Sequence, residues 1–284
     1  MEALISKQNP DGGWPYLRGK SWTEPTVYAT MAALAVRQND AASRGLRWLA
    51  ATQRRDGGWA PQPGVDQSTW VTGLVALLPV GPVSPASHAG AIRWLMGTEG
   101  HESTLEYRVR EWLLGNYLPP DQEHAGWPWV PGAAAWVGPT SVAILALEKE
   151  LRTAASSAMR DRIAEGRRFL LLRMCQGGGW NHGSARALGY DSDPYPETTG
   201  LALAALRGVS SPKVDQAIGV ARRFLSQCRS ADARNWLRIG LLAHGDLPSG
   251  ECGREVVCRT VPELSLDLIC QSGGDCRRFF WEAA

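Results

Sequence analysis

A short turn that ends in tryptophan recurs along this sequence and constrains its fold more than any other feature. The turn is complete twice and shortened twice, at Asp11–Trp14, Asp56–Trp59, Gly126–Trp127 and Gly179–Trp180. The first two tryptophans are 45 residues apart and the last two are 53 apart. A spacing in this range is typical of an array of similar supersecondary units rather than of one irregular domain.

Each unit contains two segments of different character. The segment before a turn is amphipathic: Leu46 and Leu49 share one helical face, whereas Arg44 and Arg47 lie elsewhere. The segment after a turn is apolar nearly all round, as in residues 199–206. A helix that is apolar on every face must be buried on every face. The pattern therefore predicts an inner ring of apolar helices surrounded by an outer ring of amphipathic helices.

Helical periodicity gives about six such pairs. We predict outer helices near 1–8, 41–53, 87–99, 159–175, 213–228 and 250–258. Inner helices are predicted near 24–37, 67–78, 138–150, 195–208, 230–244 and 261–271, with an additional helix at 103–116. No strand pattern of period two persists. We therefore expect an all-α fold, an α/α toroid that spans 1–284 as a single domain and is compatible with a longer natural chain.

The charge balance excludes one class of partner. The 30 basic and 28 acidic residues leave a net charge of +2, which provides no long-range attraction for nucleic acid. The sequence has no signal-peptide pattern and no run of 18 apolar residues, so we expect no transmembrane segment and a cytoplasmic protein. A peripheral contact with a membrane stays open at this stage.

One stretch carries a resemblance to a known superfamily. Arg44-Gly-x-x-Trp48-Leu-x-x-x-Gln53-x-x-Asp-Gly-Gly-Trp59 resembles the glutamine-tryptophan repeat of squalene-hopene cyclases, oxidosqualene cyclases and protein prenyltransferase β-subunits. The repeats extend to about Leu247, and the resemblance implies an α/α toroid with a central apolar cavity. We assign the repeated glutamine and tryptophan to structure, because they can satisfy helix ends and cover an adjacent outer helix.

The loop at 181–199 is rich in ionisable and aromatic side chains. Among the families that the chain resembles, class II terpene cyclases protonate an alkene with an acid in an Asp-x-Asp-Asp motif. The resemblance implies that this chain would need a similar acid. Asp191-Ser192-Asp193 supplies two of those carboxylates and lacks the third. The candidate acids are Asp191, Asp193 and Glu197, and the alternative interpretation of these residues is a turn followed by a helix N-terminus.

Loops that precede the inner helices would rim one mouth of a toroid, so their aromatic and polar side chains are candidates for substrate binding. These candidates are Trp22, Glu24, Tyr28, Trp70, Trp129, Trp136, His182, Arg186, Tyr190 and Tyr195. Plain core packing is the alternative for each tryptophan. Arg186 and His182 are placed near a polar headgroup.

A metal site has weak support. Among the families that the chain resembles, protein prenyltransferases activate a substrate thiolate with zinc held by Asp, Cys and His. The resemblance implies that a transferase of this kind would need the same ligand set. Asp267 and Cys270, one helical turn apart, and His244 are the nearest set, but no Asp-x-Cys pair begins an inner helix. We therefore predict no cofactor and no metal, and zinc or magnesium stays unsupported.

Three functional hypotheses follow. The first is an isoprenoid-handling protein that resembles a prenyltransferase or terpene cyclase and binds or transforms a hydrophobic polyprenyl or triterpenoid molecule in the central cavity. The second is a non-catalytic binding or interaction module that keeps the toroid fold. The third is carbohydrate hydrolysis, which needs two carboxylates about 5–10 Å apart, such as Glu24 or Glu197 with Asp193. The sequence does not decide whether the protein is an enzyme and identifies no partner subunit.

Overall fold

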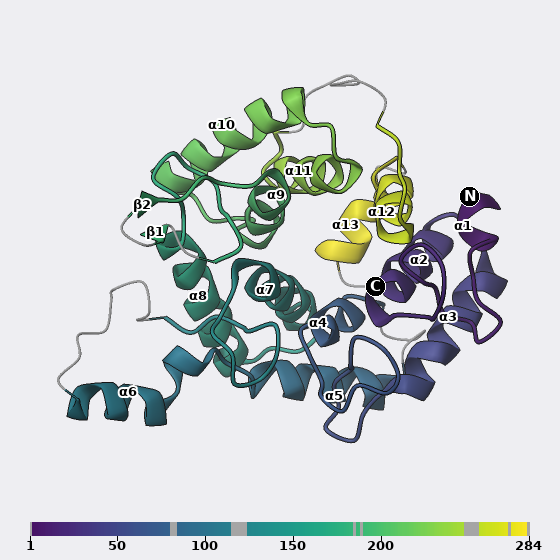
Figure 1. The fold of residues 1–284 in the computed structure, drawn as a ribbon, viewed down its shortest axis with the longest axis horizontal. Helices are drawn as coiled ribbons and strands as arrows, with labels where there is room; N and C mark the ends of the chain where they lie inside the picture. Colours follow the sequence, from purple (N-terminus) through teal and green to yellow (C-terminus); the bar gives the residue numbers. More distant parts are fainter. Residues whose placement is uncertain are drawn as a thin grey trace.

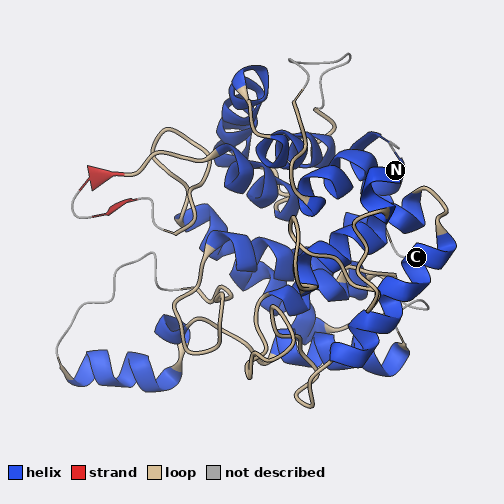
Figure 2. Cartoon of the chain, turned by 45° about the vertical axis from the view of Figure 1, so that its right-hand side comes forward, coloured by secondary structure: helices blue, strands red, loops and turns tan. Residues whose placement is uncertain are grey.

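Helices form nearly all of the regular structure of this protein. The computed structural model describes residues 2–79, 84–114, 124–183, 186–187, 190–246, 256–271 and 274–282. Two short strands, β1 (Arg186–Ala187) and β2 (Tyr190–Asp191), pair antiparallel with Arg186 opposite Asp191. Figure 2 shows this hairpin standing apart from the helices.

Six helices form a closed inner ring. They are α2 (Thr23–Ala35), α4 (Val71–Ala76), α7 (Val137–Leu151), α9 (Pro196–Ala205), α11 (Ala231–Ala243) and α12 (Val261–Gln271). Each packs against the next along the chain, and α12 returns to α2 (Figure 1). α2, α4, α7 and α9 are mostly apolar, and most of their side chains are buried, as the sequence pattern predicts. α11 and α12 depart from that prediction, because each also carries charged side chains such as Asp232 and Asp267. The predicted α/α toroid is confirmed.

Amphipathic helices surround this ring. They are α1 (Glu2–Ile5), α3 (Asn39–Thr52), α5 (Pro85–Met96), α8 (Ser157–Leu172) and α10 (Pro212–Gln227). Ser84, Ser156 and Ser211 cap the last three of these helices through side-chain oxygens that accept backbone N–H groups. Of the predicted sixth outer helix at 250–258, residues 250–255 lie outside the described residues, and 256–258 are not helical.

The tryptophan turns join the two rings. All four tryptophans are at most 2% exposed. The Trp59 indole N–H donates to the Leu49 carbonyl at 2.8 Å, and its backbone N–H donates to the Thr72 hydroxyl at 2.9 Å. The same pair of contacts recurs at Trp14, Trp127 and Trp180. Each tryptophan therefore links the end of an outer helix to the first turns of an inner helix.

Neighbouring repeats are also joined by the backbone. The amide at or next to the start of an inner helix donates to the carbonyl two residues after the tryptophan of another turn. These bonds are Thr23 to Pro61 at 2.8 Å, Trp70 to Trp129 at 3.1 Å, Val137 to His182 at 2.9 Å and Val261 to Tyr16 at 2.8 Å. The last bond connects the final inner helix to the first turn, so it helps to close the ring.

A further helix that the sequence analysis did not predict, α13 (Gly274–Phe280), lies inside the ring (Figure 1). It packs against α7 and α12, which stand on opposite sides of the ring. Phe279 and Phe280 are fully buried, and the Lys149 ammonium donates to the carbonyls of Leu77 at 2.7 Å and Phe279 at 3.2 Å. This arrangement differs from the central apolar cavity that the resemblance implies, because α13 occupies the space.

One helix projects from the body. The 3₁₀ turn η1 (His101–Ser103) leads into α6 (Leu105–Leu113), which has no buried residue and stands away from the rings (Figures 1 and 2). It falls within the additional helix predicted at 103–116. Within the described parts of the chain, no helix is long and apolar enough to cross a membrane.

The link between Trp59 and Thr72 gives a test of the fold. Thr72→Val keeps the side-chain shape but leaves the buried Trp59 N–H without its acceptor, so the free energy of unfolding should fall by about 1–3 kcal/mol. Urea denaturation followed by circular dichroism measures this change. In the matched variant Thr153→Val the lost hydroxyl is exposed, and a change within about 0.5 kcal/mol is expected. Equal losses in both variants would contradict the assigned link.

Candidate active site

Acidic side chains from four inner helices converge at one mouth of the ring. The charges of Glu24, Glu197 and Glu263 act on Asp232, so the first turns of α2, α9, α11 and α12 lie at the same end of the ring. Each of these four helices has a carboxylate in its first turn, namely Glu24, Glu197, Asp232 and Glu263. A carboxylate is favoured there by the helix dipole. Four carboxylates at one mouth, however, repel each other when they are all ionised.

The electrostatic centre of this acidic cluster is Asp232. Burial first, and then the negative charges of Glu24, Glu197 and Glu263, raise the pKa of its carboxyl from 3.8 to about 7. A hydrogen bond from the Trp236 side chain opposes this shift. Near neutral pH a large fraction of Asp232 is therefore protonated, and the group can deliver a proton.

Two tyrosines surround Glu24. The Tyr16 hydroxyl donates a hydrogen bond to the Glu24 carboxylate. Burial raises the pKa of Glu24, while the Tyr16 hydrogen bond lowers it. Tyr28 is buried one turn further along α2, and its pKa lies well above the usual value because of burial first and then the charges of Glu24 and Asp232. Both phenols therefore stay protonated and are donors.

The floor of the mouth is aromatic. Helices α9 and α11 touch backbone to backbone because Gly200 and Gly240 face each other, and a Cβ on Gly200 would lie 2.3 Å from the Trp236 carbonyl carbon. This contact sets the position of Trp236. Its ring meets Tyr28 at 6.3 Å between centroids and Phe280 of α13 at 5.7 Å. The aromatic rings and α13 therefore close the ring below the acidic cluster.

A pocket of about 1070 Å³ opens beside the acidic cluster. It lies between the α10–α11 junction and residues 256–263, and Glu263 belongs to both the pocket and the cluster. Cys228 and Val257 contribute apolar surface to its lining, and Arg229 and Arg259 contribute positive charge. A ligand in this pocket would approach the first turn of α11, which carries Asp232.

The structure separates the three predicted acids. Glu197 lies in the acidic cluster, since its charge acts on Asp232. Asp191 is exposed in β2, and Asp193 is exposed in the loop before α9. Neither is among the charges that act on Asp232. Of the predicted catalytic residues, only Glu197 belongs to the group assembled at the mouth.

The predicted binding residues form separate groups around the rim. Glu24 and Tyr28 belong to the mouth, and Trp22 joins them because its ring meets Tyr16 at 5.5 Å. His182 lies 5.3 Å from the Tyr195 ring, and its Nε2 is 3.9 Å from a carboxylate oxygen of Glu197.

The remaining rim aromatics lie apart from the acidic cluster. Trp70 and Trp129 pack edge to face at 4.8 Å. Trp136 is 37% exposed, and its ring packs beside Gly183. Tyr190 is 78% exposed. The side chain of Arg186 lies outside the described part of the structure, so its placement near a headgroup stays a prediction.

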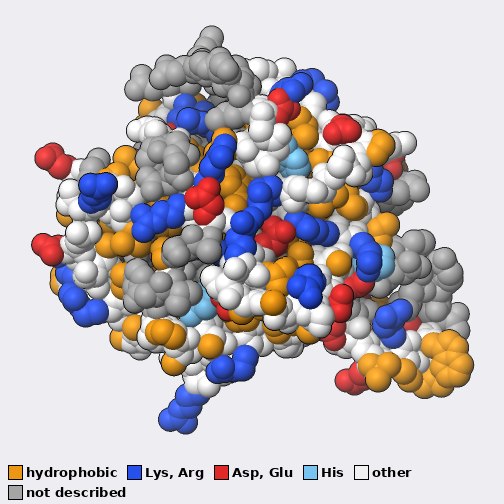
Figure 3. Space-filling view, turned by 180° about the vertical axis from the view of Figure 1, so that it is seen from behind, with side chains coloured by type: hydrophobic (Ala, Val, Ile, Leu, Met, Phe, Trp, Pro, Cys, Tyr) orange, Lys and Arg blue, Asp and Glu red, His pale blue; other side chains and the backbone are white. Residues whose placement is uncertain are grey.

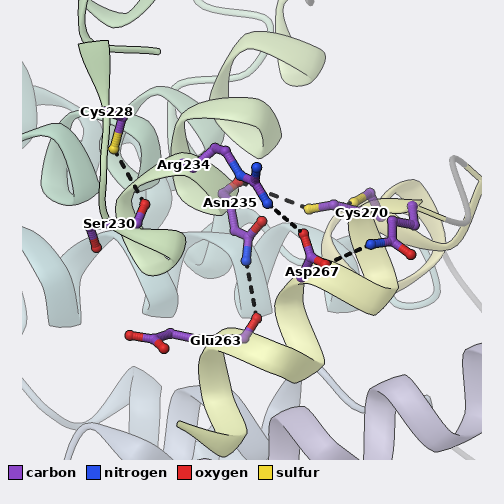
Figure 4. A network of polar contacts seen from close by, with 9 residues as sticks. Cys228, Ser230, Arg234, Asn235, Glu263, Asp267 and Cys270 are labelled. Carbon is purple, nitrogen blue, oxygen red and sulfur yellow. Dashed lines mark hydrogen bonds and ion pairs between the residues drawn. The ribbon is translucent and has the colours of Figure 1, made fainter. Parts of the chain in front are cut away.

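The metal candidates have other partners. Asp267 pairs with Arg234 at 3.0 Å, and the Cys270 thiol faces the Asn235 carbonyl (Figure 4). The His244 ring Nε2–H donates to the Leu203 carbonyl at 2.9 Å, beyond the far end of α11. Among the described residues, no group of three His, Cys, Asp or Glu side chains could hold a metal ion.

Sequence reasoning did not identify Asp232, Tyr16, Trp236 or Glu263 as site residues. Glu263 also forms a capping box with Thr260, since its carboxylate accepts the Thr260 N–H at 3.0 Å. A usable signal was available. Each acid lies within the first three positions of a predicted inner helix, and those positions converge in a toroid whose inner helices start at the same end.

The structure resembles solved proteins of two kinds. The type II terpene cyclase MstE from Scytonema aligns with 84% of this chain and 70% of its own, at 18% identity and a TM-score of 0.53. A variant of that cyclase in complex with its product, merosterolic acid A, aligns with 98% and 78%, at 16% identity and a TM-score of 0.55. Endoglucanase Cel10, a family 8 glycosyl hydrolase from Klebsiella pneumoniae, aligns with 96% and 99%, at 16% identity and a TM-score of 0.58.

No protein-family model matches the sequence, and neither does any curated protein. The solved structures, at these low identities, establish the fold. The chain has the α/α-toroid fold of type II terpene cyclases, as the resemblance in its repeats implies, and it shares this architecture with a glycosyl hydrolase.

Asp232 gives a test of the site through stability. The pKa of Asp232 is higher in the folded state, at about 7, than in the unfolded state, at 3.8, so its contribution to stability is full below pH 3.8 and is lost as pH rises through 7. Relative to Asp232→Asn, the wild type should lose at most roughly 4 kcal/mol between pH 4 and 7. Denaturation at several pH values measures this difference. Asp193→Asn should follow the wild type, and parallel curves for wild type and Asp232→Asn would refute the assignment.

Proposed function

We propose that this protein protonates an isoprenoid-type substrate at the mouth of the inner ring, with Asp232 as the general acid. The observation that supports the proposal is the position of the Asp232 carboxyl beside Trp236, Tyr28 and three carboxylates, where its pKa is raised to about 7 and part of it is protonated near neutral pH. The resemblance implies two possible reactions, prenyl transfer and terpene cyclisation. Cyclisation of the class II type needs a general acid, and Asp232 is the described residue that supports this reaction.

The proposed chemical step is the addition of a proton to an alkene. The Asp232 carboxyl transfers its proton to one alkene carbon, a C–H bond forms, and a carbocation and a carboxylate result. The faces of Tyr28 and Trp236 and the negative charges of Glu24 and Glu197 would stabilise that cation, with an aromatic face contributing up to about 2 kcal/mol when desolvated. Tyr16 holds Glu24 in place through its hydrogen bond.

The projecting helix α6 supports an apolar substrate. Leu105, Val109 and Trp112 share one face of α6, and Leu113 follows at 71% exposed. Figure 3 shows hydrophobic side chains gathered on this projecting part at the lower right. Such a face, on a helix that also carries Arg108 and Arg110, suits a peripheral contact with a membrane, from which a prenyl lipid could be taken up.

Two other functions remain as alternatives with a specific observation behind each. A non-catalytic module is favoured by α13, which occupies the space that an enclosed substrate would need. Carbohydrate hydrolysis is favoured by the pairing of Asp232, whose pKa is raised to about 7, with neighbouring carboxylates, because glycosidases use one acid and one base or nucleophile. The likeness to endoglucanase Cel10 is compatible with the latter.

Product analysis after incubation with geranylgeranyl diphosphate, farnesyl diphosphate and squalene tests the main proposal. Asp232→Asn should lower the turnover of any accepted substrate by about 10²–10⁴-fold, because an amide cannot supply the proton. Asp193→Asn is the matched control and should retain activity, since that carboxylate is exposed. Mass spectrometry of the extracted products gives the readout.

Three outcomes would contradict the proposal. Full activity of Asp232→Asn would remove the acid from its role. The release of reducing ends from a β-glucan, without prenyl turnover, would favour hydrolysis. If the protein neither binds nor converts the two prenyl diphosphates, squalene or the β-glucan, the result would favour the non-catalytic module.

Co-sedimentation with phosphatidylcholine–phosphatidylglycerol vesicles tests the membrane contact. Leu113→Ser should weaken the partitioning by roughly tenfold, since a buried leucine contributes about 1.5–3 kcal/mol. Leu17→Ser is the matched control, because Leu17 is an exposed leucine on a different loop. Equal binding by both variants and the wild type would exclude α6 from the contact.

A further inference from the structure

One repeat lacks the loop that covers the others. Residues 6–22, 53–70, 97–136 and 173–195 connect outer to inner helices elsewhere, whereas only Cys228, Arg229 and Ser230 connect α10 to α11. This junction has no tryptophan turn. The pocket of about 1070 Å³ lies directly at the shortened connection.

The neighbouring helix is adapted to the missing loop. In three other repeats, the loop of the next repeat provides a carbonyl for the amide at the start of an inner helix: Pro61 for Thr23, Trp129 for Trp70 and His182 for Val137. The corresponding helix here, α9, begins at Pro196, which has no N–H. The shortened connection therefore leaves no donor unsatisfied at that place, and the gap is a stable part of the architecture.

The pocket combines apolar and basic surface. Val256 and Val257 form part of one wall, and Arg229 and Arg259 are exposed at its edges. Within the described chain, neither guanidinium group forms an ion pair with a carboxylate. Arginine side chains without acidic partners match the geometry of phosphate oxygens through paired N–H groups.

We propose that this pocket binds the substrate and selects an apolar chain with an anionic end, namely a prenyl diphosphate, held by Arg229 and Arg259. This inference rests on the proposed isoprenoid function and names the substrate class for that site. The pocket volume slightly exceeds the range of about 300–1000 Å³ that is usual for small-molecule sites, so a prenyl chain can be accommodated.

The separation of charges in the site fits this assignment. The charges that act on Asp232 are the three carboxylates and not the two guanidinium groups. The positive charges of the arginines, which would lower the pKa of Asp232, therefore do not act on the acid, and Asp232 can stay protonated beside the arginines that hold the anionic end. Glu263 lies between the two parts, since it lines the pocket and acts on Asp232.

Isothermal titration of the full-length protein tests the proposal without requiring turnover. Geranylgeranyl diphosphate should bind at least about tenfold more tightly than geranylgeraniol, because the alcohol lacks the charged group. Arg229→Gln and Arg259→Gln should each weaken diphosphate binding by about tenfold and leave alcohol binding unchanged. Arg223→Gln, an exposed arginine on α10 outside the pocket, is the matched control and should bind like the wild type.

The possible failures are distinguishable. Equal affinity for the diphosphate and the alcohol, with no effect of the two arginine variants, would contradict the claim that the arginines bind an anionic group. The proposed role of Asp232 as the acid would not be affected by that result. An equal loss in Arg223→Gln would reduce the effect to net charge and overturn the site. Inorganic diphosphate that binds as tightly as the prenyl compound would overturn the apolar part of the pocket. Turnover of squalene that depends on Asp232, without diphosphate binding, would overturn this inference but not the proposed function.

Discussion

The structure depends on a backbone hydrogen bond repeated around the inner ring. The first amides of a helix have no partner inside that helix and must find one elsewhere if they are buried. Here the carbonyl two residues after a buried tryptophan of another repeat satisfies four of them. Each tryptophan is held in turn by an outer helix and by a threonine hydroxyl of an inner helix, so the turn positions the carbonyl that another repeat needs.

This constraint has an electrostatic consequence. The bonds hold the starts of α2, α4, α7 and α12, and the contact between Gly200 and Gly240 packs α9 against α11. Acids in the first turns of these helices are thereby brought close together at one mouth. A carboxylate at one helix N-terminus is stabilised by the dipole. At Asp232, burial and three neighbouring carboxylates outweigh that effect and raise the pKa. The same packing that closes the ring therefore creates the group best suited to acid chemistry.

Much of the fold was predictable because its repeats are local patterns. The turn at Gly57 and Trp59 and the buried helix after Thr199 could be predicted, because the residues next to them in the sequence form recognisable patterns. The site was harder to predict, because Glu24 and Asp232 are far apart in the chain and meet only when α12 brings α2 and α11 together. Asp191 and Asp193 are two residues apart, which made them candidates, but Asp191 is exposed in β2 and Asp193 is exposed in the loop before α9. The position of α13 was not predictable, since its burial depends on the space that the other helices leave.

The burial of α13 decides how a substrate can approach. Phe279, Phe280 and Trp281 are each at most 5% exposed. Aromatic side chains bury about 150–250 Å² each, and at about 25 cal/mol per Å² the three together stabilise α13 by roughly 10 kcal/mol or more before entropy is considered. This burial holds α13 inside the ring, where it fills the space that a central cavity would need. In the proposed function a substrate would therefore bind at the mouth that carries Asp232, beside the pocket at the shortened α10–α11 connection, rather than in an enclosed central cavity.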